Sequence, residues 1–374
     1  MSNDRFNVKE LRELYDMYPE RLERGKKRQS AVWLGEKPDY WPIAMAGELT
    51  DKQQKIPDPD ISEAFNDADM MLCQQMRMAC RIANGNSDAV PSIRANTGTG
   101  TLLSCLGLEQ EAPYGQMPWL KKHYTREQVA EMSVDDINIQ GTFASALDFI
   151  AYFKEIVGDL IDIYCVDTQG PFDLAHLLLG DEVFYLIFED PELLHHTLEL
   201  CTELYIQATK ATKAAIGEDN NSMVHGMLNA PTAGVRICED TTTLIGNEAV
   251  EEFALPYTLR AAGEFGGAWI HFCGRCDILR DIMCEQEEVK GMNYGIVPSK
   301  EYDFDFDKEI KRMAATKTVY HGDIPRLPNE SGKDYLRRLY DYCESGYVIP
   351  KAQSALGENN GFESVEQALD FWYS

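Results

Sequence analysis

The chain has 374 residues, 44% of them hydrophobic and 26% charged, an ordinary globular composition that allows a sizeable buried core. Its 35 basic and 62 acidic residues give a net charge of −27. A surface of that sign repels nucleic-acid phosphates and anionic lipids. Binding to nucleic acids or membrane surfaces is therefore disfavoured, and the ordinary interpretation of the charge is solubility.

The N-terminal residues 1–9 are polar and charged, without the apolar run of a signal peptide. No stretch approaches the roughly 20 apolar residues of a membrane span. The ten cysteines are scattered along the chain without an export signal, so a disulfide framework is not expected. We expect a cytoplasmic protein in which most cysteines are buried thiols.

The first 85 residues predict an N-terminal helical extension. Residues 1–30 are charged and helical in pattern, and residues 61–85 form a second helical stretch. Between them, the Pro- and Asp-rich stretches 38–42 and 57–60 predict loops. We expect this extension to pack on a larger unit.

Beyond it, short β-prone runs alternate with helical patterns. The clearest helix is predicted at 191–216, where Asp190 can cap it, Pro191 suits the first turn and Gly217 ends it. The expected strands are 89–93, 163–168, 222–227, 268–273, 290–294, 317–321 and 346–349.

This alternation predicts an α/β protein with a parallel sheet. About seven strands favour a closed (β/α)8 TIM barrel over an open doubly wound sheet. Neither glycine-rich nucleotide-binding motif follows any of these runs. We therefore expect a single barrel domain over residues 1–374, with the helical extension packed on it.

The sharpest candidate site is the strand 268–273 with the loop after it. Alternate side chains of a strand share a face, so His271 and Cys273 point the same way. The C-terminal end of a barrel strand faces the active site, and imidazole and thiolate are preferred zinc ligands. Cys276 is placed to add a further sulfur, although a buried histidine and two structural thiols is the alternative interpretation.

Other polar residues follow predicted strands. Asp167 and Gln169 share a face before a Gly-Pro turn, which could instead be a simple capped turn. His225 ends a predicted strand, where a structural histidine is the ordinary alternative. Asp240 follows Glu239 before a helix, where acids are commonly caps. His321 also lies at a strand end.

Several stretches, taken together, resemble the uroporphyrinogen decarboxylase superfamily, and most of all its cobalamin-dependent methyltransferases of the methylcobalamin:coenzyme M type. They keep the family's order and cover nearly the whole chain. They are residues 28–42 (RQSAVWLGEKPDYWP), 167–180 (DTQGPFDLAHLLLG), 188–193 (FEDPEL), 236–240 (RICED), 253–257 (FALPY), 266–274 (GGAWIHFCG) and 322–323.

The resemblance implies a (β/α)8 barrel and a zinc site with His271 and Cys273 as ligands. It also implies a reaction in which a zinc-activated thiolate takes a methyl group from methylcobalamin on a partner corrinoid protein. Asp167, Gln169, His225 and Asp240 would line the pocket for a small-molecule methyl acceptor. Whether the protein is a homodimer stays open.

The chain departs from that branch at the third zinc ligand, a cysteine near the C-terminus. The comparable stretch 346–355 (GYVIPKAQSA) has none. Cys276, Cys343 or a carboxylate would have to substitute, or the site holds no zinc.

Two further functions stay open. One is a decarboxylase of the same fold, although the chain lacks the family's N-terminal arginine segment and has only Lys27 to Ser30 there. The other is a non-catalytic barrel that binds a tetrapyrrole or a corrinoid protein.

Overall fold

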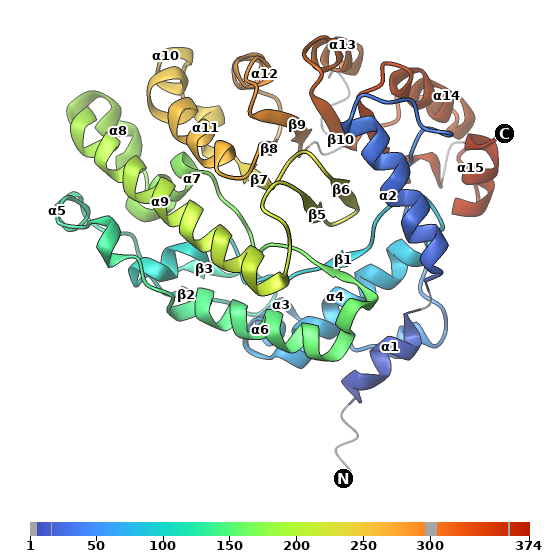
Figure 1. Ribbon diagram of the computed structural model, residues 1–374, viewed down its shortest axis with the longest axis horizontal. Helices are drawn as coiled ribbons and strands as arrows, with labels where there is room; N and C mark the ends of the chain where they lie inside the picture. The colour runs from blue at the N-terminus through green and yellow to red at the C-terminus, as the bar shows by residue number, and fades with distance from the viewer. Residues whose placement is uncertain (1–5, 16, 296–304, 358–359) are drawn as a thin grey trace.

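A computed structural model describes residues 6–15, 17–295, 305–357 and 360–374 (Figure 1). Its largest sheet is parallel and contains five strands in the order β11-β10-β9-β8-β7. These strands are β7 (Val235–Cys238), β8 (Ala268–Phe272), β9 (Val289–Tyr294), β10 (Val319–Asp323) and β11 (Val348–Lys351).

The sheet continues past β7. β1 (Ser92–Ile93) and β4 (Asp162–Ile163) pair in parallel, and a parallel bridge between Gln169 and Cys238 joins the chain after β4 to β7. The predicted strands 89–93 and 163–168 are therefore present at these positions, with shorter regular parts than expected.

The segment around Ala44 closes the other edge. Ala44 forms a parallel bridge with Lys351 of β11, and the N–H of Asp88, before β1, donates to the carbonyl of Ile43 at 2.9 Å. Hydrogen bonds therefore run around a ring of eight segments, and the predicted (β/α)8 barrel is confirmed. Residues 43–45 lie in the predicted extension, yet they are buried and contribute one segment of this ring. That the chain forms one domain stays a prediction.

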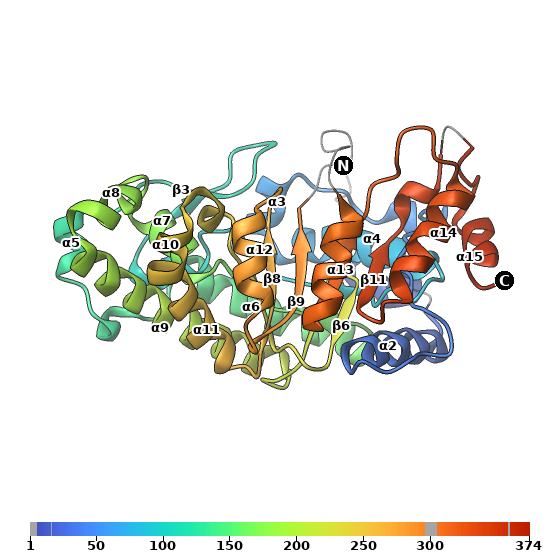
Figure 2. The same cartoon turned by 90° about the horizontal axis from the view of Figure 1, so that it is seen from above.

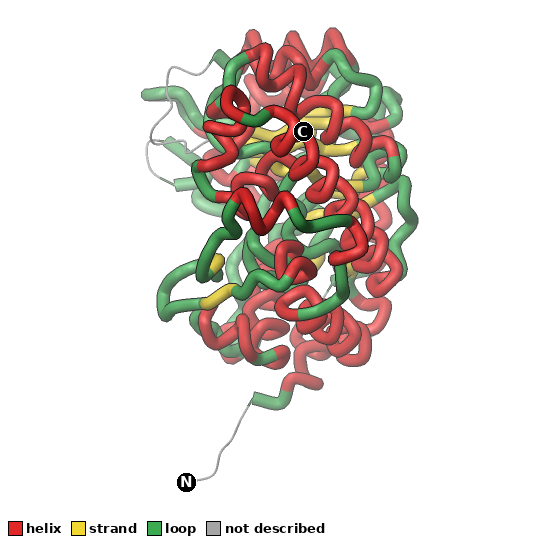
Figure 3. The backbone as a smooth tube through the Cα atoms, turned by 90° about the vertical axis from the view of Figure 1, so that its left-hand side faces the viewer, coloured by secondary structure: helices red, strands yellow, loops and turns green. Residues whose placement is uncertain are grey.

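Helices surround the strands, as the tube in Figure 3 shows, and α11 to α14 lie side by side in Figure 2. The N-terminal helices are α1 (Leu11–Leu14), α2 (Pro19–Trp33), α3 (Ile61–Asn66), α4 (Ala68–Asn84), α5 (Arg126–Ala130) and α6 (Gly141–Val157). The later ones are α7 (Pro171–Leu179), α8 (Glu182–Glu189), α9 (Pro191–Ile216), α10 (Asn247–Ala249), α11 (Leu255–Gly263), α12 (Asp277–Cys284), α13 (Phe306–Thr316), α14 (Gly332–Cys343) and α15 (Val365–Trp372). In the described residues no helix has the length and apolar character to cross a membrane.

Helix α9 confirms the clearest sequence prediction. Its bounds are those expected, the Asp190 side chain accepts the N–H of Leu193, and Gly217 ends the helix at a φ of 83°. That left-handed conformation is one that glycine adopts without steric cost. Five side chains spaced alternately by four and three residues form one buried face of this helix: Leu194, Leu198, Cys201, Tyr205 and Ala208.

Residues 222–227 were predicted to form a strand of the parallel sheet, and this prediction is wrong. This run forms β5 (Met223–His225), which pairs antiparallel with β6 (Leu228–Ala230) in a hairpin, while β2 (Gln110–Glu111) and β3 (Trp119–Leu120) form another. Gly226, with a φ of 64°, allows the tight turn between β5 and β6. The ring strand is instead β7, in a stretch where no strand was predicted.

Candidate active site

The candidate site lies where β7 and β8 end. Their register pairs Cys238 with His271 and, two residues earlier, Arg236 with Trp269. Because alternate residues of a strand share a face, these pairs form an upper and a lower layer inside the ring. Two residues along a strand span about 6.6 Å, so the layers are within reach of one small molecule.

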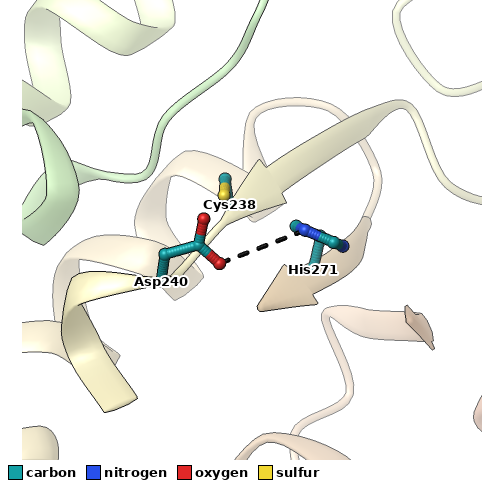
Figure 4. Close-up of side chains that lie close together, drawn as sticks. All are labelled: Cys238, Asp240 and His271. Carbon is teal, nitrogen blue, oxygen red and sulfur yellow. Dashed lines mark ion pairs between the residues drawn. The ribbon is translucent and has the colours of Figure 1, made fainter. Parts of the chain in front are cut away.

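The upper layer contains a cluster of metal-binding groups (Figure 4). One donor atom each of Cys238, Asp240 and His271 lies within 4.8 Å of the others, and His271 Nε2 is 4.0 Å from Asp240 Oδ1. Cys273 Sγ lies 3.6 Å from the same Nε2, and the backbone N–H of Cys273 donates to Asp240 Oδ1 at 2.6 Å. The Asp240 carboxylate therefore holds the turn that carries Cys273.

Asn293 on β9 determines which nitrogen of His271 carries the proton. The Asn293 amide nitrogen donates to the carbonyl of His321 at 2.7 Å, so its oxygen faces His271 and accepts from Nδ1 at 2.6 Å. The lone pair on Nε2 then points into the cluster. Burial, and next the charge of Arg236, lower the pKa of His271 to about 4, which keeps the imidazole neutral and able to bind a metal at pH 7.

The thiols next to it are protonated without a metal. Burial and the neighbouring Asp240 carboxylate raise the pKa of Cys273 to about 11. Burial also raises the pKa of Cys238 well above its ordinary value. A cation bound in the cluster would be needed to hold either sulfur as thiolate at neutral pH.

Asp167 and Gln169 meet, as expected from their shared face, with Gln169 bridged to Cys238 at the level of the upper layer and Asp167 two residues lower. Gln169 Nε2 donates to Asp167 Oδ1 at 2.5 Å, and Arg94 Nη1 donates to Oδ2 at 3.3 Å. Arg236 Nη1 lies 3.8 Å from Oδ1, an ion pair without a hydrogen bond. Burial acts to raise the pKa of Asp167, but the two arginines and Gln169 outweigh it and the pKa is lowered overall, so the carboxylate is ionised.

The β5–β6 hairpin brings His225 to the same interior. Its ring lies 4.7 Å from that of Tyr164 and 5.4 Å from that of Trp269, between centroids. Burial and then the charges of Arg236 and Arg94 lower the pKa of His225 well below its usual range, so this imidazole is neutral. The residue reaches the predicted location by a hairpin rather than by a ring strand.

Three buried polar atoms of this interior make no hydrogen bond with any described residue. They are Arg236 Nη1, Trp269 Nε1 and His321 Nε2. Because a buried polar group without a partner costs free energy, these atoms point to a bound molecule or ordered water.

Cys276 and Cys343 do not belong to the metal-binding cluster in the described residues. Cys276 is the N-cap residue of α12 and packs against the hydrophobic core. Cys343 ends α14 and is fully buried in that core. The donors beside His271 and Cys273 are instead Asp240 and Cys238, because β7 lies next to β8, a neighbour relation that the sequence did not reveal.

Sequence reasoning missed Arg236, Cys238, Asn293 and also Asp173. The Asp173 carboxylate on α7 accepts the backbone N–H of Asp240 at 3.0 Å and of Thr241 at 2.7 Å, which orients the turn that carries Asp240. A carboxylate in an apolar helix, as in PFDLAHLLL, was the available signal.

His321 gives a pH-dependent prediction for metal-free protein. Its Nδ1–H donates to the carbonyl of Ile349 at 2.8 Å, and burial lowers its pKa from 6.5 to about 3. Below pH 6.5 the unfolded chain therefore takes up a proton that the folded chain does not, so stability falls as the pH falls. We expect wild type to lose about 1.4 kcal/mol per pH unit relative to His321→Asn between about pH 6 and about pH 4.

Urea titrations of both proteins across that range measure the difference. Asparagine keeps an N–H donor for Ile349, so the substitution removes mainly the titrating group. Parallel pH profiles would contradict the assignment of a neutral, buried His321.

The ring, its polar interior and the cluster at its mouth define a (β/α)8-barrel protein with a site built for polar ligands. A family model, uroporphyrinogen decarboxylase (URO-D), matches residues 24–315, and the chain belongs to this family. No curated protein matches the chain. Among solved structures, a methyltransferase from Methanosarcina mazei is similar, with a TM-score of 0.65, 16% identity, and coverage of 94% of this chain and 99% of that chain.

Proposed function

We propose that this barrel is a corrinoid-dependent methyltransferase, an enzyme that moves a methyl group between a corrinoid protein and a thiol or other one-carbon acceptor in the cytoplasm. The observation that carries the proposal is the 3.6 Å separation of His271 Nε2 and Cys273 Sγ beside the Asp240 carboxylate. The methyltransferase from Methanosarcina mazei has a similar fold, which agrees with this choice within the family.

The residues present fit a zinc ion. Tetrahedral zinc bound by a histidine nitrogen and a thiolate places those two atoms about 3.6 Å apart, and a nitrogen and a carboxylate oxygen about 3.4 Å apart. The corresponding distances are 3.6 Å for His271–Cys273 and 4.0 Å for His271–Asp240. His271 and Cys273 would hold the ion with Asp240 as the third ligand, and Cys238 is a second candidate for that place. Zinc, when bound, would favour the thiolate form of a substrate thiol at neutral pH.

The chain's own residues would orient the acceptor. The unbonded donors of Arg236 and Trp269 lie one layer below His271 and would bind the polar end of a small acceptor, leaving its reacting end at the mouth. Asp167, near Arg236, and Gln169, bridged to Cys238, would complete the pocket, with the neutral His225 beside Trp269. Such pre-positioned groups lower the entropic cost of reaching the reactive arrangement.

A decarboxylase is the second candidate, because the interior is cationic in a strongly acidic protein. Arg236, Arg94 and Lys351 all contribute, after burial, to lowering the pKa of His225, while Asp167 is the carboxylate that the two arginines share. Excess positive charge would suit a substrate that carries carboxylates.

Two measurements test the proposal. Metal analysis of the purified protein is expected to find about one zinc per chain. Incubation with methylcobalamin, or a methylated corrinoid protein, and candidate thiols is then expected to demethylate the corrinoid, as followed by its absorbance. Metal-free, correctly folded protein would refute the zinc site, and zinc-loaded protein that is inactive toward every acceptor would favour the non-catalytic barrel. Release of carbon dioxide from a tetrapyrrole carboxylate would favour the decarboxylase.

The role of Asn293 gives a separate prediction. Asn293→Ala removes the acceptor that holds the proton on Nδ1 of His271, so we expect zinc affinity to fall by about 10- to 100-fold while the fold is retained. Competition with a zinc-binding dye measures the affinity. Asn229→Ala, on the β5–β6 hairpin, is the matched control and is expected to leave the affinity unchanged.

A further inference from the structure

Cys273 and Cys276 form a Cys-Gly-Arg-Cys sequence at the junction of β8 and α12. Cys273 is the first residue after β8, and Cys276 is the N-cap residue of α12. Gly274 between them has a φ of 83°, in the left-handed region, which lets the chain reverse within a few residues. The proposed function uses Cys273 and leaves Cys276 without a role.

The two thiols of this pair are accessible together. Cys273 is exposed and Cys276 is half-buried. Apart from the half-buried Cys165, the remaining cysteines are buried: Cys73, Cys80, Cys105, Cys201, Cys238, Cys284 and Cys343. A small thiol reagent in solution therefore meets Cys273 first, and Cys276 is the nearest thiol along the chain.

Hydrogen bonds hold both ends of the junction, and the side chain of Arg275 between them pairs with Asp277. The N–H of Cys273 donates to Asp240, and the carbonyl of Cys276 accepts the N–H of Arg280 at 3.0 Å. The side chain of Cys276 makes no capping hydrogen bond, so its rotation breaks none. A disulfide needs Cα atoms within about 7 Å, and the backbone bends at Cys273 and Gly274, between the two cysteines.

We propose that Cys273 and Cys276 are a redox-active dithiol that forms a disulfide with low-molecular-weight disulfides of the glutathione class. In the first step Cys273 attacks one sulfur of the reagent as its thiolate, a minor form of this thiol near neutral pH that becomes more populated as the pH rises, and the S–S bond of the reagent breaks to release one thiol. In the second step the Cys276 thiolate attacks the Cys273 sulfur of the mixed disulfide and releases the other thiol. The two protein thiols are oxidised, the reagent is reduced to two thiols, and these take up the two protons.

Disulfide formation would change the candidate active site. A sulfur bonded to Cys276 is no longer a thiolate, so Cys273 would cease to be a zinc ligand beside His271. This consequence rests on the proposed function, whereas the disulfide itself does not. Oxidation would then inactivate the enzyme reversibly, as in other intracellular cysteine pairs that respond to the redox state.

The disulfide can be observed directly, because Arg275 lies between the two cysteines. Trypsin cleaves after Arg260, Arg275 and Arg280 and so separates peptide 261–275 from peptide 276–280. After the folded, full-length protein is treated with glutathione disulfide and free thiols are blocked, we expect these peptides as a linked pair in mass spectrometry. Dithiothreitol is expected to separate them.

Two variants make the assignment specific. Cys276→Ser is expected to lose the linked pair completely, and Cys284→Ser, which removes a buried cysteine of the same helix, is expected to keep it. A Cys273 that carries only glutathione, a link from Cys273 to Cys238, or no reaction in the folded protein would each overturn the proposal. If zinc is present, its release should parallel the linked pair in wild type. The linked pair in protein that never contained zinc would support the dithiol and contradict the proposed zinc site.

Discussion

Replacing His271 by alanine is expected to remove the zinc and to lower methyl transfer by more than about 100-fold. Even the residues that orient a metal-binding histidine contribute about 10- to 100-fold to affinity or activity, so loss of the ligand itself should exceed that. The alanine also removes the Nε2 atom that lies 3.6 Å from Cys273 Sγ, which leaves the thiol next to Asp240. Metal content per chain and the rate of corrinoid demethylation are the two measurements.

The matched control is His195→Ala. His195 lies on α9, where its Nδ1 pairs with the Tyr257 hydroxyl at 2.8 Å, outside the strands that form the site. We expect this variant to keep both zinc and activity. A His271→Ala protein with full activity would show that the chemistry lies elsewhere, and one that keeps zinc but loses activity would point to a role for the imidazole other than metal binding.

Replacing Arg280 on α12 by methionine is expected to have a large effect on stability. Its side chain is 2% exposed and forms an ion pair with Glu309 on α13, which is 3% exposed. Glu309 otherwise keeps only the Tyr294 hydroxyl, at 3.1 Å, among the partners described. Arg280→Met would leave this carboxylate buried without its cation, and we expect the free energy of unfolding to fall by about 3–5 kcal/mol.

Chemical denaturation at neutral pH measures this change. Arg312→Met is the control, because Arg312 pairs with Asp281 and Glu285 at the surface, where its side chain is 32% exposed. An exposed pair contributes less than about 1 kcal/mol. If both variants lost the same free energy of unfolding, burial of the Arg280–Glu309 pair could not be the cause of the larger effect expected for Arg280→Met. Since α12 begins at Asp277, directly after Cys276, this pair also anchors the helix that follows the candidate site.

The parts of the fold that could be predicted are those determined by nearby residues. The N-cap, the first-turn proline and the terminal glycine of α9 all lie at its own ends, and its bounds were predicted correctly. The His271–Cys273 pair followed from the alternation within one strand. β7 was missed because it has only four residues, too few to show a pattern, and its partners are residues 169 and 268–271.

The rest of the site depends on contacts between strands. Asp240 was expected as a pocket residue, but its position beside His271 requires that β7 and β8 be neighbours. Asn293 orients His271 from β9. The register between β8 and β9 cannot be predicted from the sequence of either strand alone. Cys276 was expected as a possible ligand, but it is the N-cap residue of α12 and lies outside the metal-binding cluster of the described residues.

The bridge between Ala44 and Lys351 links positions 307 residues apart in the chain. During synthesis the apolar stretch 43–45 therefore leaves the ribosome about 300 residues before its partner strand β11. Until then the nascent chain has an incomplete barrel with open strand edges, and such edges bind to other chains. The ring can therefore close only after β11 has been made, and chains that stop before β11 should aggregate rather than accumulate as a smaller stable barrel.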